Sequence, residues 1–230
     1  MSDMKTKNRT WLYPLIVIGL VNILANSCKK EEEIITDVEG NVYTSVTIGT
    51  QVWMVENLKT TKYSNGDLIG TTDPATLDIS AEAAPKYQWA YNGNESNVNT
   101  YGRLYTWYAV TDTRNVCPTG WHVPTDEEWT ILTTYLGGED IAGGKLKEIG
   151  TTHWSTPNTG ATNETGFTAL PSGNRSSDAY YHAGESDCLW SSTEAFQAFT
   201  YTRSMYCYSS NIARYSESKQ YGFSVRCLRD

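Results

Sequence analysis

The sequence predicts an α+β domain in which a small mixed or antiparallel sheet is flanked by two short helices and interrupted by a long loop region. Three observations carry this prediction. An alternating segment with a central turn near residue 49 indicates a β-hairpin. A helix with a capping sequence begins at Thr125, and strand-like segments return after residues 150–187, which have the composition of a long loop.

The first 27 residues have the pattern of an export signal. An apolar run extends from Trp11 to Leu20, which is shorter than the roughly 20 residues that a membrane-spanning helix needs. It fits the apolar region of a signal peptide, because basic residues precede it. These basic residues are Lys5, Lys7 and Arg9.

Cys28 follows this run, and the segment resembles the cleavage site of bacterial lipoproteins, where a lipid is attached to the cysteine. Residues 28–36 then form a short acidic tether that resembles the signal sending lipoproteins of some Gram-negative bacteria to the outer face of the outer membrane. The sequence therefore predicts a lipid-anchored protein of the cell outer membrane that faces the exterior. One alternative is an ordinary signal peptide cut near Ser27, with Cys28 an unmodified thiol. Another is a tether that acts as a spacer and carries no sorting signal.

Charge and cysteine content limit the partners. The chain has 18 basic and 26 acidic residues, and three of the basic residues and one of the acidic residues lie in the first 27 positions. The remainder has 15 basic and 25 acidic residues, which gives a net charge of −10. Such a surface repels nucleic acids and anionic lipids, so contact with the membrane is expected through the anchor only. Four further cysteines in an exported domain suggest two disulfides, for which three pairings are possible. They are Cys117, Cys188, Cys207 and Cys227.

The first half of the domain, which we place at residues 37–230, predicts short elements. Residues 42–48 and 52–55 read as the strands of the hairpin, and residues 87–91 are the best strand candidate of the region that follows. Residues 101–110 predict a short helix.

A second helix is predicted with both of its ends. Thr125 is a good N-cap, and Glu128 three residues later completes a capping box. Gly137 and Gly138 end this helix, and residues 141–149 add one more.

The C-terminal segments return to strands at residues 189–192, 199–208 and 222–228. Arg203 and Arg214 lie among them and are expected at the surface, where substitutions cost little. The chain is rich in aromatic residues, with 16 tyrosines and 8 tryptophans. Five tryptophans are expected to fill the core: Trp53, Trp107, Trp121, Trp129 and Trp190.

Six segments in a fixed order carry a family resemblance: residues 46–58, 101–110, 117–129, 163–171, 190–194 and 222–228. Together they resemble the Fibrobacter succinogenes major paralogous family, often called FISUMP domains. This family occurs in exported bacterial proteins, often lipoproteins, and the resemblance implies no particular activity.

A more distant resemblance is to the C-type-lectin-like fold, including its formylglycine-generating-enzyme branch, on residues 124–129 and 222–226. In that fold a cysteine near the first helix bonds one in the last strand. The resemblance therefore implies a bridge from Cys117 to Cys227, which leaves Cys188 to pair with Cys207. Pairing of Cys207 with Cys227 is the alternative.

Catalytic and metal-binding chemistry find little support. A formylglycine-generating oxidase would need a close pair of reactive cysteines, and Cys188 and Cys207 lie nineteen positions apart. The three histidines are isolated and show no zinc-ligand spacing. No nucleophile elbow surrounds Ser191. We therefore expect a protein that is not an enzyme and has no resident metal.

Residues 150–187 hold the candidate ligand-binding residues. Thr156-Pro157-Asn158 echoes the Glu-Pro-Asn of sugar-binding lectins, but the glutamate is missing, so calcium is only a secondary expectation. Aromatic side chains in loops bind sugars and proteins well because they are large and amphipathic. The candidates are Trp154, Asn158, Asn163, Glu164, Tyr180 and Tyr181.

The sequence thus favours a non-catalytic cell-surface lipoprotein that binds a glycan or a surface protein, as in carbohydrate binding and adhesion, through these loops. A structural lipoprotein that serves assembly without a small ligand is the first alternative. An enzyme of the formylglycine-generating kind is the second.

Overall fold

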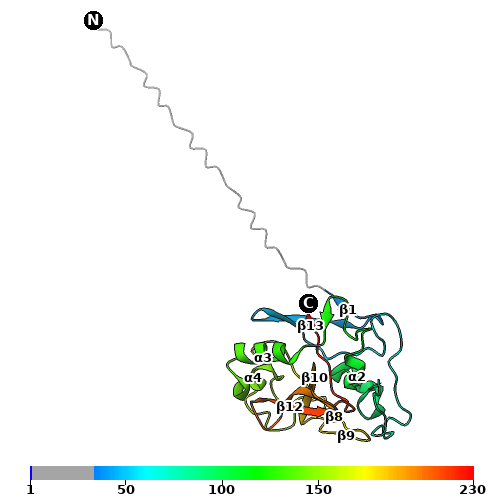
Figure 1. The fold of residues 1–230 in the computed structure, drawn as a ribbon. Helices are drawn as coiled ribbons and strands as arrows, with labels where there is room; N and C mark the ends of the chain where they lie inside the picture. The colour runs from blue at the N-terminus through cyan, green and yellow to red at the C-terminus, as the bar shows by residue number, and fades with distance from the viewer. Residues whose placement is uncertain (2–33) are drawn as a thin grey trace. The chain divides into compact units, whose positions relative to one another are not determined.

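The computed structural model describes Met1 and residues 34–230. The expected signal peptide, Cys28 and most of the tether therefore lie outside the described residues. From Ile34 onward the chain forms an α+β unit with several small, mostly antiparallel sheets (Figure 1). No helix in this described part is long and apolar enough to cross a membrane.

A four-stranded sheet joins the two ends of the domain. Its strands, in spatial order, are β3 (Ser45–Ile48), β4 (Gln51–Met54), β13 (Leu228–Arg229) and β7 (Trp121–His122). The predicted hairpin is confirmed, because β3 and β4 pair antiparallel around Gly49, whose positive φ suits a tight turn. Leu228 pairs with both Trp53 and His122, so the last strand lies between early and middle segments. A separate small sheet pairs β1 (Ile35–Thr36) with β2 (Val42–Tyr43).

The second large sheet is a three-stranded antiparallel meander. It consists of β10 (Ser186–Phe196), β11 (Phe199–Tyr206) and β12 (Ile212–Ser218). The predictions for residues 189–192 and 199–208 are confirmed in outline. The third segment, predicted as a strand over residues 222–228, differs. Residues 222–224 make only isolated bridges, such as Tyr105 to Phe223 and Leu189 to Ser224, and only Leu228 of this segment belongs to β13.

The helices confirm one prediction fully and correct another. Helix α3 (Asp126–Tyr135) has the predicted capping box between Thr125 and Glu128, and α4 (Glu139–Leu146) follows it. The single helix expected at residues 101–110 is wrong. The segment forms instead α1 (Val98–Tyr101), β6 (Leu104–Tyr105) and α2 (Trp107–Val110).

Gly102 explains the break between α1 and β6. Its φ of 75° and ψ of −161° cannot continue a helix, and it packs against Asn57, where a side chain at this position would clash. Beyond it, Tyr105 exchanges backbone hydrogen bonds with Phe223. Pairing with the rest of the fold therefore overrides the local helical pattern.

Residues 150–187 are mainly irregular, as expected, but contain a small hairpin. Strand β8 (Asn174–Arg175) pairs antiparallel with β9 (Tyr180–Tyr181). Strand β5 (Gln88–Trp89) lies within residues 87–91, which were expected to form a strand, and it pairs with β6. Two 3-10 helices, η1 (Tyr91–Gly93) and η2 (Glu95–Asn97), lead from there to α1.

The core consists of two apolar clusters that meet at β10. Alternate residues of β10 enter different clusters, with Cys188 and Trp190 in one and Leu189 in the other. The ring centroids of Trp53 and Trp129 lie 4.6 Å apart in the second cluster. The expected tryptophan core is confirmed for all five residues, although Trp107 is only partly buried.

One of the two predicted disulfides is present. Cys117 and Cys227 are bonded, and they link the segment before β7 to the segment before β13. The predicted bridge between Cys188 and Cys207 is wrong, since both are buried free thiols. Cys188 pairs in register with Ser204, whereas the amide of Cys207 bonds the carbonyl of Glu185. Cys207 therefore lies opposite Glu185, which is three positions from Cys188 along the neighbouring segment. Side chains an odd number of positions apart lie on opposite faces of a sheet, so the two thiols point to opposite faces.

Candidate functional site

Two of the predicted ligand-binding residues are part of the core. The Trp154 side chain is 1% exposed, and its indole nitrogen donates to the carbonyl of Ala169 at 2.9 Å. Asn158 is 6% exposed, and its amide nitrogen donates to the carbonyls of Glu148 and Gly150. Both side chains hold loop backbone together, so their assignment to a binding surface is corrected: they stabilise the loops that carry it.

Asn163 and Glu164 lie beside α4. Asn163 bonds the amide and hydroxyl of Thr168, which closes a local turn. Glu164 is exposed and forms an ion pair with Lys145 of α4 at 3.0 Å. These two residues are therefore placed with the helix and not with the β8–β9 hairpin.

Five aromatic side chains stand on the loops, and we call them together the loop surface: Tyr91, Tyr101, His153, Tyr180 and Tyr181. Tyr181 is 47% exposed, and the other four side chains are partly buried. The rings of Tyr91 and Tyr180 meet edge to face at 5.3 Å. Those of Tyr101 and His153 do the same at 5.9 Å.

Arg175 holds the surroundings of Tyr180 in place. Its guanidinium is fully buried, lies 4.1 Å from the centre of the Trp89 ring and donates to the carbonyls of Ala75 and Leu77. The hydroxyl of Tyr180 donates to the same Ala75 carbonyl. Burial lowers the pKa of Arg175. Its guanidinium donates to four backbone carbonyls, and these hydrogen bonds offset the free-energy cost of burying the charge.

Close backbone contacts connect the loops that carry the Tyr91–Tyr180 pair with the loop that carries His153. Gly173 lies against the Tyr91 ring, with no room for a side chain, and beside the backbone of Tyr181. The amide of Ser155 donates to the carbonyl of Gly184 at 2.7 Å, which ties the His153 loop to the segment that follows β9. His153 is itself fixed by an ion-pair contact with Glu148 at 2.8 Å. The aromatic side chains therefore stand on loops that are rigidly connected.

The β8–β9 hairpin, which carries Tyr180 and Tyr181, lies at a defined end of the domain. In Figure 1, β8 and β9 lie at the end opposite β1 and the C-terminus. The chain enters the domain at β1, so the hairpin lies away from the point of entry.

Sequence reasoning proposed Tyr180 and Tyr181 as candidates but did not include Tyr91, Tyr101 or His153. These three residues come from about 90, 80 and 30 positions before β9, so their ring contacts are seen only in the fold. Gly173 and Gly184 were the available signals, because both hold positive φ angles at the close contacts described above.

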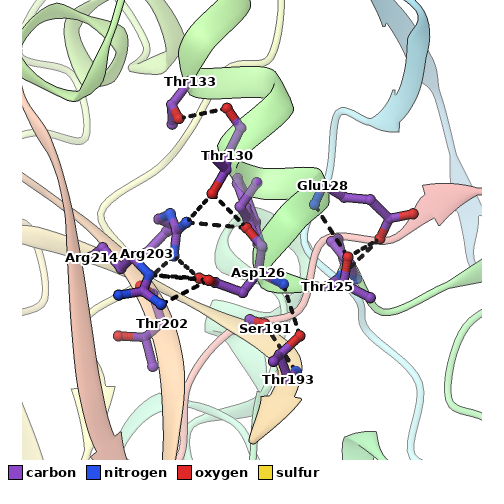
Figure 2. Close-up of polar contacts among 12 residues, drawn as sticks. Thr125, Asp126, Glu128, Thr130, Thr133, Ser191, Thr193, Thr202, Arg203 and Arg214 are labelled. Atoms are coloured by element: carbon purple, nitrogen blue, oxygen red, sulfur yellow. Dashed lines mark hydrogen bonds and ion pairs between the residues drawn. The ribbon is translucent and has the colours of Figure 1, made fainter. Parts of the chain in front are cut away.

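A buried ion cluster at the start of α3 is the second candidate. Figure 2 shows Asp126 between Arg203 and Arg214. Arg203 donates to Oδ1 of Asp126 at 2.6 Å and to the hydroxyl of Thr130 at 3.2 Å, and Arg214 contacts both carboxylate oxygens. Burial raises the pKa of Asp126, but the hydrogen bonds from both arginines outweigh it, so the pKa is lowered overall.

The contacts favour a structural role for this cluster. The two carboxylate oxygens already accept four hydrogen bonds from two guanidinium groups, which occupies the lone pairs that a substrate would use. Its effect is to clamp α3 onto β11 and β12. The expectation that Arg203 is a surface residue is wrong, since its side chain is fully buried, whereas Arg214 is 38% exposed.

A cavity of about 260 Å³ opens at the other end of the domain, beside β1 and the disulfide. Asp37 is the acidic side chain in its lining, together with Lys62 and Ser64. Asp37 is already bonded by the amides of Glu39 and Asn41 and by the hydroxyl of Tyr43. This cavity therefore presents little free recognition chemistry, and it faces the end where the chain enters.

Comparisons with known proteins give one match. The family model of the Fibrobacter succinogenes major domain matches residues 46–229. No curated protein and no solved structure matches the chain.

Proposed function

The chain belongs to the Fibrobacter succinogenes major domain family, a family of surface-associated domains, and from this premise we propose that it is a non-catalytic glycan-binding lipoprotein. It is anchored through Cys28 to the outer membrane and faces the exterior. The domain is a C-type-lectin-like module, in which the last strand lies beside the first hairpin and long loops carry the ligand surface.

The observation that carries the proposal is the loop surface. Tyr91 meets Tyr180 and Tyr101 meets His153, on loops that are joined by backbone hydrogen bonds, and Tyr181 is exposed beside them. A tyrosine ring offers an apolar face for the C–H groups of a sugar and a hydroxyl for its polar groups. A surface held rigidly before binding loses little conformational entropy when the ligand arrives.

The position of the β8–β9 hairpin is compatible with the same proposal. It lies at the end of the domain opposite β1, where the chain enters (Figure 1). A ligand bound at Tyr181 would therefore not meet the segment through which the chain enters the domain.

A glycan array probed with the purified full chain tests the proposal. Tyr181→Ala should weaken binding about 2- to 12-fold, because an aromatic contact contributes about 0.5–1.5 kcal/mol. Its melting temperature should stay close to that of the unmodified chain, since the side chain is 47% exposed. Tyr135→Ala is the matched control, because this tyrosine is 65% exposed at the end of α3, away from the loops.

Two results would count against the proposal. One is an array without a bound glycan, and capture of a protein partner in its place would favour the protein-binding alternative. The other is equal loss of binding in Tyr181→Ala and Tyr135→Ala, which would place the glycan elsewhere.

A further inference from the structure

A second group of tyrosines lies on one face of the β10–β11–β12 sheet. Side chains alternate along a strand, so Tyr206, Ser204 and Thr202 of β11 share a face. The antiparallel register pairs Thr202 with Tyr215 of β12, which puts Tyr215 on that face too. Tyr208, just after β11, stacks on Tyr206 with ring centroids 5.2 Å apart and planes at 18°.

These three tyrosines form a row, which we call the tyrosine row. Tyr208 is 65% exposed and Tyr215 is 44% exposed, whereas Tyr206 is partly buried. Ala213 pairs in register with Ser204 between them, and Ser204 is buried, so the solvent-accessible part of the row is formed by the tyrosines. Four strand positions separate Tyr206 from Thr202, the partner of Tyr215, which corresponds to about 14 Å at about 3.4 Å per residue.

The row continues into the loop surface. The amide of Cys207 donates to the carbonyl of Glu185 at 2.8 Å, directly beside Tyr208. The Glu185 carboxylate contacts His182 at 3.2 Å, and the rings of His182 and Tyr181 lie 6.1 Å apart. His182, Glu185 and Tyr181 are all exposed. An exposed strip therefore connects Tyr181 with Tyr208.

The charges along the row favour an uncharged ligand. Glu217 pairs in register with Thr200, which is on the same face as Tyr206, so its carboxylate extends the row. Glu217 is partly buried, burial raises its pKa, and within residues 34–230 no side-chain hydrogen bond or ion pair of its carboxylate is found. The neighbouring cations are engaged elsewhere: Arg214 bonds Asp126 on the other face, and Lys219 pairs with Glu194. Sugar hydroxyls can donate to such a carboxylate, whereas an anionic polymer would be repelled.

We propose that the ligand is an extended, uncharged polysaccharide chain that runs from the loop surface along the strip to the tyrosine row. This inference rests on the proposed glycan-binding function and adds the class of glycan. The two aromatic surfaces bind different parts of one chain. Occupying both at once raises the affinity for long chains, because the second contact is intramolecular.

Isothermal titration of the full chain with cello-oligosaccharides and malto-oligosaccharides, from the disaccharide to the octasaccharide, tests the inference. Affinity for one series should rise with length until both surfaces are covered. Tyr208→Ala and Tyr215→Ala should each weaken octasaccharide binding about 3- to 10-fold, as expected for loss of one aromatic contact. The same variants should leave disaccharide binding unchanged, whereas Tyr181→Ala should weaken both.

The outcomes separate the two proposals. Equal affinity at all lengths, or octasaccharide binding that is insensitive to Tyr208→Ala and Tyr215→Ala, overturns the extended ligand and leaves glycan binding at the loop surface intact. Tighter binding of polygalacturonate than of the neutral chains overturns the uncharged class. Failure to bind either series overturns the inference, and failure on the glycan array as well overturns the proposed function. Tyr135→Ala is the control throughout, and the melting temperature of each variant checks its fold.

Discussion

Asp126 shows how one carboxylate can hold several elements of this domain. It lies in the first turn of α3, where the helix dipole already favours a negative charge. Arg203 reaches it from β11 and Arg214 from β12, and Arg214 also stacks 3.6 Å from the centre of the Tyr201 ring. The two arginines differ in burial, so they should differ in their effect on stability.

Arg203→Ala should destabilise the protein by about 3–5 kcal/mol, because it leaves the charge of Asp126 without its buried partner. Arg214→Ala should cost at most about 1 kcal/mol, since a partly exposed ion pair is screened by solvent. Urea denaturation of the two variants measures both effects. Equal costs would contradict the structural role assigned to Arg203.

Residue type alone could not reveal this difference. Arginine is usually exposed, so a sequence pattern places both arginines at the surface. Arg203, however, pairs in register with Leu189, a core residue, and therefore points inward with it. Its burial depends on α3 supplying Asp126 from 77 positions away, and no local pattern contains that information.

Asp187 is the other buried charge with a measurable consequence. It is fully buried in β10, the hydroxyl of Ser172 donates to one of its oxygens at 2.9 Å, and Asn57 lies near the carboxyl group. Burial raises its pKa to about 6, and the attraction of the buried Arg226 opposes that rise only in part. The carboxyl therefore binds its proton more tightly in the folded state than in the unfolded chain.

This shift makes stability depend on pH in a defined direction. Between a pKa of about 3.9 in the unfolded chain and about 6 in the folded one, the folded state holds more protons. The contribution of Asp187 to stability is therefore most favourable below about pH 4 and falls as pH rises through 6. Above that pH the ionised group costs roughly 3 kcal/mol, from about two pKa units at 1.36 kcal/mol each.

Asp187→Asn should remove this dependence. The free energy of unfolding of the variant, minus that of the unmodified protein, should increase between about pH 4 and about pH 7.5. The difference is the right quantity, because Asp126 has a lowered pKa and gives a slope of opposite sign. Asp178→Asn, at an exposed position of the same region, is the control. A constant difference across this range would show that Asp187 does not titrate as described.

At the scale of elements, prediction succeeded where the signals are local. The cap of α3 and the turn at Gly49 depend on neighbouring residues, and both are present as expected. Strand β12 was missed because its central residues, 214–216, are all exposed and show no alternation of apolar and polar side chains. It is a strand because β11 supplies its hydrogen-bond partners, which a single segment does not reveal.

The disulfide ties two of these elements together, and its pairing can be checked directly. Non-reducing peptide mapping should link the Cys117 peptide to the Cys227 peptide and recover Cys188 and Cys207 as alkylated free thiols. Reduction should destabilise the protein by up to about 4.7 kcal/mol, the value for a loop of about 100 residues. In the native protein both thiols should react slowly, because both are buried and burial raises the pKa of Cys188 to about 11.

The double variant Cys188→Ala/Cys207→Ala should keep the Cys117–Cys227 link. A cross-linked Cys188–Cys207 peptide from the unmodified protein would contradict the placement of these residues on opposite faces of the sheet.

At the scale of the whole molecule, the candidate site was predictable only as a region. Residues 150–187 do supply the β8–β9 hairpin with Tyr180 and Tyr181. Trp154 and Asn158 lie in the same region, yet they support its backbone from inside. Loop composition cannot distinguish a side chain that faces solvent from one that is buried beneath the loop, since both occur between the same turn residues.

The disulfide and the four-stranded sheet hold the C-terminal strand at the end of the domain where β1 begins, and the β8–β9 hairpin lies at the other end (Figure 1). The proposed lipid on Cys28 would attach the chain to a membrane without any spanning helix.

Cys28→Ala should therefore change the location of the protein and leave its folding intact. The variant should be recovered in the soluble exported fraction, whereas the unmodified chain should fractionate with membranes, because the lipid supplies the membrane affinity. Its melting temperature and its affinity for soluble glycans should match those of the unmodified chain in detergent, since the β8–β9 hairpin lies at the far end of the domain. Cells that carry the variant should lose surface capture of glycan-coated beads. Membrane association of Cys28→Ala would show that something other than this cysteine anchors the chain.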